Sequence, residues 1–141
     1  MSKKIIVPID DSIHSHHALQ FAVKIAKEMD GEIVILNVQP NLFTPNIQRF
    51  IAKREIHQYL QQMADVILEK ASELIREEDV QVEKIVRIGI PKVEITKLAK
   101  ELDAFQIVMG SRGMGPVKSA VLGSVSIGVL QLTPCPVTIV P

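Results

Sequence analysis

Short apolar runs alternate with amphipathic helical patterns along the whole chain, and this alternation restricts the fold more than any other feature. Apolar residues recur at helical spacing between the runs. Strands that alternate with helices form parallel sheets with helices on both faces. The sequence therefore predicts an open, five-stranded parallel α/β sheet, with strands near residues 5–9, 33–38, 80–88, 105–109 and 137–140.

Particular residues mark where these elements begin and end. Ser12 is a suitable N-cap for the first helix, and Gly31 stands where a residue that ends a helix belongs. Pro91 suits the first turn of a helix because that turn needs no N–H from it. Pro8 is acceptable in a strand only near the end, where the ladder of hydrogen bonds stops.

A helical pattern from Gln48 to Glu77 is unusually long for this chain. At about 1.5 Å per residue it would span about 45 Å. A domain of this length is expected to be about 37 Å across. We therefore expect the helix either to project or to break near Arg54, with its first turns forming a flap or a subunit contact.

The amino-acid composition argues against several classes of protein. The 141 residues suit one domain spanning 1–141, and the net charge of zero argues against DNA or RNA as the main partner. No apolar run reaches about 18 residues, so no membrane span is expected. Cys135 is the only cysteine, and we expect a cytoplasmic protein in which it is a buried structural thiol.

Glycines concentrate after the fourth expected strand, where four of the seven lie between residues 110 and 123. Glycine allows close backbone approach, and successive N–H groups can then bind an anion. Gly123 and Ser124 stand at the start of a helix, where free N–H groups favour phosphate. A flexible surface loop with an ordinary serine cap is the alternative. The loop is not a Walker A motif, because Val117 precedes Lys118 where that motif needs glycine.

Carboxylates follow one of the expected strands, and glycines concentrate after another. In open α/β sheets, ligands bind beyond the carboxyl ends of the strands, where the strand order reverses. Asp10 and Asp11 follow the first strand, and the glycine-rich stretch follows the fourth. We therefore expect these two ends to form one site.

The spacing Gly110-x2-Gly113-x9-Gly123-Ser124 resembles the ATP-binding signature of the universal stress protein (UspA-type) family. The opening I-I-V-P-I-D, Gly89-Ile90-Pro91 and the closing Pro134-Cys135-Pro136-Val137 extend the resemblance over the whole chain. It implies a Rossmann-like sheet of order 3-2-1-4-5, similar to adenine nucleotide alpha hydrolases.

The resemblance also implies a site for ATP, with Mg²⁺ or Mn²⁺ carried by the phosphates and no metal site made by protein alone. Asp10 would bond the ribose or adenine, Val38 would meet the adenine edge, and residues 123–126 would hold the phosphates. The implied nucleotide-binding residues are Pro8, Ile9, Asp10, Val38, Met109, Gly110, Arg112, Gly113, Gly123, Ser124, Val125 and Ser126.

Several residues near this site have alternative interpretations. Asp10 would otherwise cap the following helix. Asp11 replaces a glycine frequent in the family, and a carboxylate there would either repel phosphate or help to hold a metal ion. His14, His16 and His17 look like a metal cluster, but only the first and third share a helical face, so no metal site is expected. Arg112 and Lys118 are candidates for phosphate contact or for solvated loop charges.

The sequence thus predicts an ATP-binding regulatory module of the stress response, with no catalytic residue assigned. The apolar closing strand Val137–Val140 would be an aggregation hazard if uncovered. We therefore expect a two-fold homodimer through it, as the resemblance implies. A slow ATPase or nucleotide-transferring enzyme using Asp10 or Asp11 is one alternative. An interaction module that binds no nucleotide is the other, and the downstream protein partner is open.

Overall fold

The computed structural model describes residues 2–42, 44–113 and 122–141. Within them no helix is long and apolar enough to cross a membrane. In chain order the elements are β1 (Lys4–Pro8), α1 (Ile13–Met29), β2 (Glu32–Gln39), α2 (Pro45–Gln48), α3 (Lys53–Leu74), β3 (Gln81–Ile88), α4 (Pro91–Glu101), β4 (Gln106–Gly110), α5 (Ser124–Leu132) and β5 (Val137–Val140).

The five strands form one parallel sheet in the order β3-β2-β1-β4-β5. This confirms both the predicted α/β class and the strand order that the resemblance implied. After β3 the chain crosses back to place β4 on the free side of β1. The strand order therefore reverses between β1 and β4, and the carboxyl ends of these strands diverge into a crevice where such sheets bind ligands.

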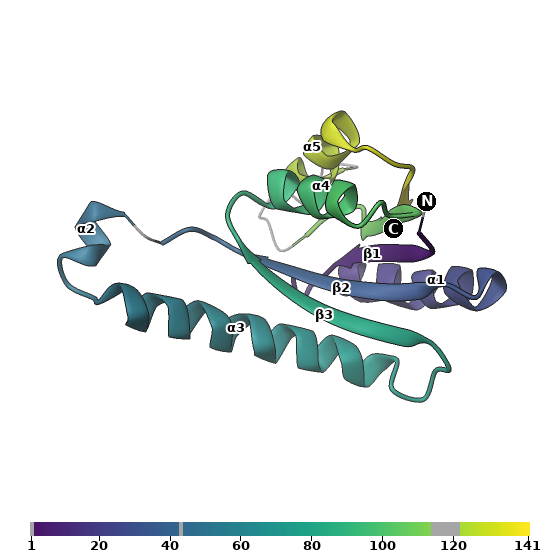
Figure 1. The fold of residues 1–141 in the computed structure, drawn as a ribbon, viewed down its shortest axis with the longest axis horizontal. Helices are drawn as coiled ribbons and strands as arrows, with labels where there is room; N and C mark the ends of the chain where they lie inside the picture. Colours follow the sequence, from purple (N-terminus) through teal and green to yellow (C-terminus); the bar gives the residue numbers. More distant parts are fainter. Residues whose placement is uncertain (1, 43, 114–121) are drawn as a thin grey trace.

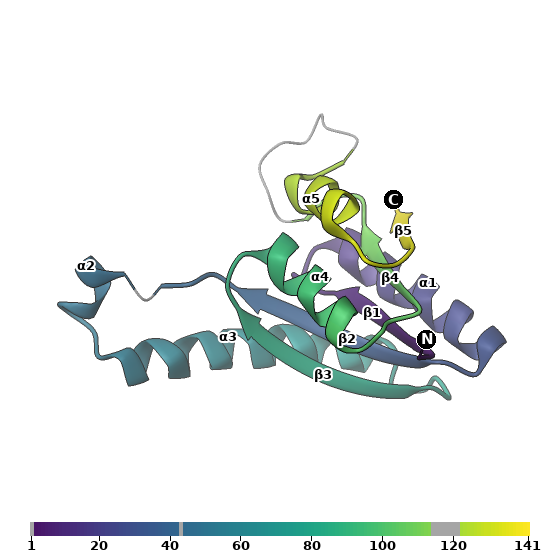
Figure 2. The ribbon, with the colours of Figure 1, turned by 45° about the horizontal axis from the view of Figure 1, so that its top comes forward.

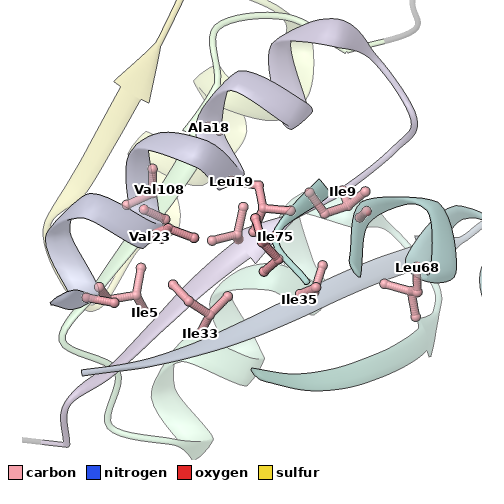
Figure 3. Packing of buried hydrophobic residues seen from close by; sticks show 14 residues of the cluster. Ile5, Ile9, Ala18, Leu19, Val23, Ile33, Ile35, Leu68, Ile75 and Val108 are labelled. Atoms are coloured by element: carbon pink, nitrogen blue, oxygen red, sulfur yellow. The ribbon is translucent and has the colours of Figure 1, made fainter. Parts of the chain in front are cut away.

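Helices cover both faces of the sheet (Figures 1 and 2). One face is covered by α1 and α3, the other by α4 and α5. On the first face, Ile5 and Ile33 pack against Leu19 of α1 (Figure 3). Ile6 belongs to the opposite cluster. Neighbouring residues of β1 thus enter different cores, which explains the unbroken apolar run, and burying each such side chain contributes about 1.5–3 kcal/mol.

The two ends of α1 confirm one predicted helix boundary residue and contradict the other. Ser12 is the N-cap, and its hydroxyl oxygen accepts a hydrogen bond from Ser15 N, as predicted. The left-handed residue at the other end is Asp30, with φ 54°, so the role predicted for Gly31 was wrong. Gly31 instead allows a close approach of two backbone segments, because a Cβ there would lie only 2.9 Å from the carbonyl oxygen of Lys3.

The expected long helix is broken, in agreement with one of the two alternatives. α2 ends at Gln48 and α3 begins at Lys53. α2 lies beyond the end of α3, away from the sheet (Figure 1). Between the two helices Phe50 is 86% exposed. A role for this segment as a flap or subunit contact stays a prediction.

Candidate functional site

A pocket opens at the carboxyl ends of β1, β2 and β4, on the face covered by α4 and α5. Its volume is about 120 Å³. Sites for drug-sized ligands usually occupy about 300–1,000 Å³, so this pocket encloses one ring system and leaves the rest of a larger ligand at the rim. Its lining residues are Pro8, Ile9, Asp10, Ser15, Leu36, Val38, Pro91, Ile95, Met109, Gly110, Arg112, Gly113, Val125 and Ser126.

The segment after β1 forms one wall of the pocket. Ile9 N donates to the carbonyl oxygen of Leu36 over 2.8 Å, which continues the pairing of β1 with β2. Asp10 Oδ1 accepts a hydrogen bond from Ser12 N over 3.1 Å. Ser12 itself caps α1, so Asp10 is not the cap. The Asp10 carboxylate is held in the pocket wall by the turn that precedes the helix.

Two buried amide side chains fix this wall from the other face of the sheet. Asn37 Nδ2 donates to the carbonyl oxygen of Ile9 over 2.7 Å, and Gln39 Nε2 donates to Asn37 Oδ1 over 2.7 Å. Only 2% of Asn37 and 8% of Gln39 are exposed. Gly89 N donates to the carbonyl oxygen of Gln39, which also anchors the turn before α4. Sequence reasoning missed this pair, although amides two residues apart in an apolar strand were the available signal.

Two glycines allow close backbone approach around the pocket. A Cβ on Gly113 would lie 2.3 Å from Asp10 Oδ2, so the glycine brings the two strand-end segments together. A Cβ on Gly110 would lie 2.7 Å from the carbonyl carbon of His14, where α1 crosses the end of β4. The predicted juxtaposition of the first and fourth strand ends is therefore confirmed.

The first turn of α5 borders the same pocket. Its N-cap is Gly123, and no side chain caps the helix. The first N–H groups of a helix have no partner within the helix, so this end presents donors and the positive end of the helix dipole. Ser126 is 2% exposed, and its hydroxyl lies 3.0 Å from the carbonyl oxygen of Gly110.

The structure gathers most of the expected nucleotide-binding residues around this pocket. Gly123 and Ser124 are the two that do not line it, and they stand beside it at the start of α5. Lys118 lies outside the described residues. The lining residues that sequence reasoning missed are Ser15, Leu36, Pro91 and Ile95. Their signals were weak, since Leu36 and Ile95 look like ordinary core, Pro91 looks like a helix start and Ser15 looks like any polar residue of a helix.

Asp11 is directed away from the pocket. Its φ of 70° is left-handed, a conformation that glycine adopts without strain. Asp11 Oδ1 lies 3.2 Å from Lys70 Nζ of α3 and 3.5 Å from His16 Nε2. The second carboxylate thus faces cationic and histidine neighbours, and it is not among the lining residues.

The three neighbouring histidines have three different surroundings. His14 Nε2 lies 3.4 Å from the guanidinium of Arg112, which lines the pocket. His17 Nδ1 lies 3.3 Å from the carbonyl oxygen of Pro141, and His16 faces Asp11. In the described parts of the chain, no three histidine, cysteine or acidic side chains converge in a way that would hold a metal ion.

Cys135 lies outside the pocket, between α5 and β5. It is half-buried rather than fully buried as expected. Burial raises the pKa of its thiol above the ordinary value and outweighs the opposing hydrogen bonds from Thr133 and the backbone of Ile107. A thiol with a raised pKa is a poor nucleophile at neutral pH, which fits a structural role.

The fold and the pocket together define a class, namely doubly wound α/β proteins with a ligand crevice at the point of strand reversal. The model of the universal stress protein family matches residues 1–141, and the chain therefore belongs to that family. It is 40% identical over 149 residues to universal stress protein YxiE of Bacillus subtilis, covering 99% of each chain. The solved structure of the hypothetical protein MJ0577 is 28% identical, with a TM-score of 0.85 over 99% of this chain and 96% of that one.

Two further solved structures contain nucleotides. A universal stress protein in complex with cAMP is 22% identical to this chain, with a TM-score of 0.75 over 98% of this chain and 96% of its own. The protein from Archaeoglobus fulgidus in complex with dAMP is also 22% identical, with a TM-score of 0.72 over 98% and 97%. At this identity the two likenesses show the fold alone.

Proposed function

We propose that this protein binds ATP and acts as a nucleotide-dependent regulatory module of the stress response. The observation that carries the proposal is one continuous surface, in which an apolar pocket at the strand reversal passes into an uncapped helix N-terminus. The adenine nucleotides in the two similar proteins support it. An apolar cavity beside an anion-binding helix end suits a ligand with an aromatic base and a phosphate chain.

The pocket has the chemistry for the nucleoside end of ATP. Leu36, Val38, Ile95 and Met109 supply apolar surface for a flat base. Asp10 is the one carboxylate among the lining residues of the described chain. An ionised carboxylate only accepts hydrogen bonds, and ribose hydroxyls are the donors that it would pair with. Asp10 is therefore assigned to the ribose.

The phosphates would lie along the first turn of α5. Main-chain N–H groups after Gly123 and the guanidinium of Arg112 are the donors on this side. Mg²⁺ or Mn²⁺ would arrive with the phosphates, since Mg²⁺ is commonly bound through substrate phosphates and few protein ligands. The metal would neutralise phosphate charge, while the chain's own groups orient the nucleotide.

We further propose a two-fold homodimer through β5. The outer strand at the other side of the sheet, β3, carries Glu83, Lys84 and Arg87, and such charges discourage pairing with another chain. β5 has the sequence V-T-I-V and is half-buried along its length. In sedimentation velocity we expect a dimer, and the charge that Thr138→Glu adds to this edge strand should dissociate it. A Thr138→Val control should remain dimeric. A monomeric wild type, or a dimeric Thr138→Glu, would refute this interface.

The binding proposal is tested by calorimetric titration of nucleotide-stripped protein. We expect ATP with Mg²⁺ to bind at micromolar concentration, with about one site per chain. Asp10→Ala should weaken adenosine and ATP alike, whereas the control Asp11→Ala, outside the pocket, should weaken neither. Absence of both heat and thermal stabilisation would refute nucleotide binding. A loss confined to the triphosphate would show that Asp10 does not bind the ribose. Steady release of phosphate, abolished by Asp10→Ala without loss of binding, would favour an enzyme.

A further inference from the structure

We propose that Ser126 is a positioning residue, whose hydroxyl fixes the start of α5 to the end of β4 and does not itself donate to phosphate. The inference rests on the proposed nucleotide function, because it concerns how the phosphate end of that site is built. It also changes the role expected for this serine, which was that of a direct phosphate ligand.

The proton of the Ser126 hydroxyl is already committed. Its oxygen lies 3.0 Å from the carbonyl oxygen of Gly110 and 3.2 Å from that of Ser111. Both neighbours only accept hydrogen bonds, and a serine hydroxyl has a single proton to donate. The oxygen retains only lone pairs, which repel phosphate oxygens. With 2% of the residue exposed, the side chain is also enclosed by protein.

The carbonyl groups that receive this proton are themselves held in place. Ser111 N donates to the carbonyl oxygen of Val140 over 2.8 Å, which anchors the segment to β5. The carbonyl oxygen of Ser111 also accepts a hydrogen bond from Gly123 N over 2.8 Å. Ser126 and Gly123 therefore hold the same carbonyl from two points of one helical turn.

This arrangement orients the phosphate donors before any ligand binds. The N–H groups of the first turn of α5 point in a fixed direction because the turn is tied to Gly110 of β4 and to Ser111, which follows it. A site that is already ordered loses less conformational freedom on binding, and this raises affinity without an additional contact. Loss of the Ser126 hydroxyl should therefore weaken ATP through disorder of the turn and leave the nucleoside end of the pocket largely intact.

The experiment compares Ser126→Ala with Ser126→Cys, which keeps the approximate volume but donates weakly, and with Ser126→Thr, which keeps the hydroxyl. Thr96→Val removes a buried hydroxyl from α4 that donates to the carbonyl oxygen of Lys92, and it controls for general loss of stability. Hydrogen exchange at the amides of 123–127 is measured in ligand-free protein, and dissociation constants are measured for ATP and adenosine.

In Ser126→Ala and Ser126→Cys we expect exchange at Gly123 N to rise about tenfold without ligand. ATP affinity should fall about tenfold, while adenosine affinity changes less than about threefold. Ser126→Thr should restore both properties, and the control Thr96→Val should leave the ratio of ATP to adenosine affinity unchanged. A merely structural serine would not move that ratio.

Three results would overturn the assignment. Weakened ATP binding with unchanged exchange in the ligand-free protein would mean that the hydroxyl donates directly to phosphate. Faster exchange with unchanged ATP affinity would leave Ser126 a structural residue only. A wild-type protein that binds neither ATP nor adenosine would remove the proposed function and the positioning role together. Because exchange is measured without ligand, that outcome is distinct from the other two.

Discussion

Substitution of Gly123 should weaken phosphate binding with little effect on the stability of the fold. A Cβ at this position would lie 3.4 Å from Arg112 Cα and 3.7 Å from Gly113 N, which are ordinary contacts, and the φ of −78° suits any residue. Valine is a poorer N-cap than glycine, so Gly123→Val should cost less than about 1 kcal/mol. For a chain of this length, that corresponds to a fall in Tm of no more than about 3 °C.

The same side chain should strongly affect ATP. Its two methyl groups would occupy the space beside Gly113 N and the first turn of α5, where the phosphates are proposed to lie. Each hydrogen bond to a charged group contributes about 1.5–3 kcal/mol, so the loss of even one lowers ATP affinity at least about tenfold. Adenosine, which has no phosphate, should keep its affinity. Calorimetry with both ligands, alongside thermal unfolding, measures these effects.

Gly110→Ala is the contrasting variant. Its Cβ would lie 2.7 Å from the carbonyl carbon of His14, so the backbone of α1 would have to retreat by several tenths of an ångström. Such overpacking costs about 1–3 kcal/mol, equivalent to about 3–10 °C in Tm. A folded Gly123→Val with unchanged ATP affinity would refute the phosphate assignment. Equal losses of ATP and adenosine would refute the division of the pocket into two ends.

Other perturbations test the surroundings of the site. Asn37→Leu leaves the carbonyl oxygen of Ile9 without its buried donor and should lower the free energy of unfolding in urea by about 1–3 kcal/mol. An unchanged midpoint would contradict the role of the Asn37 amide in holding Ile9. Asp11→Gly removes the strain of a left-handed aspartate but also removes an exposed contact with Lys70. The free energy of unfolding should therefore stay the same or rise by up to about 1 kcal/mol. A clear fall would mean that the contact with Lys70 contributes more than the backbone strain costs. Since burial raises the pKa of Cys135, the folded state holds that proton more tightly, and its stabilisation is lost as the pH rises through the folded pKa. As the pH rises in the alkaline range, the free energy of unfolding of wild type should therefore fall more steeply than that of Cys135→Ala. Parallel curves for the two proteins would contradict a raised pKa of the Cys135 thiol.

Local pattern was sufficient for the strands, for most of the helices and for the general position of the site. The order of strands and helices, the Ser12 cap and the start of α5 at Ser124 follow from periodicity and capping, because each depends on residues close together in sequence. The strand-end rule also placed Asp10 and the glycine-rich stretch together, since parallel strands all end at one edge of a sheet.

Tertiary structure decided the features that depend on which segments become neighbours. Sequence periodicity cannot show that Asn37 holds Ile9, that Asp11 turns toward Lys70, or that Gly31 serves a close approach to Lys3. The Ser126 hydroxyl is the clearest case, because its acceptors lie in a segment 15 and 16 residues earlier in the chain. A serine at a helix start can bind phosphate or tie the helix down, and only the packing of α5 against the end of β4 determines the direction of its proton.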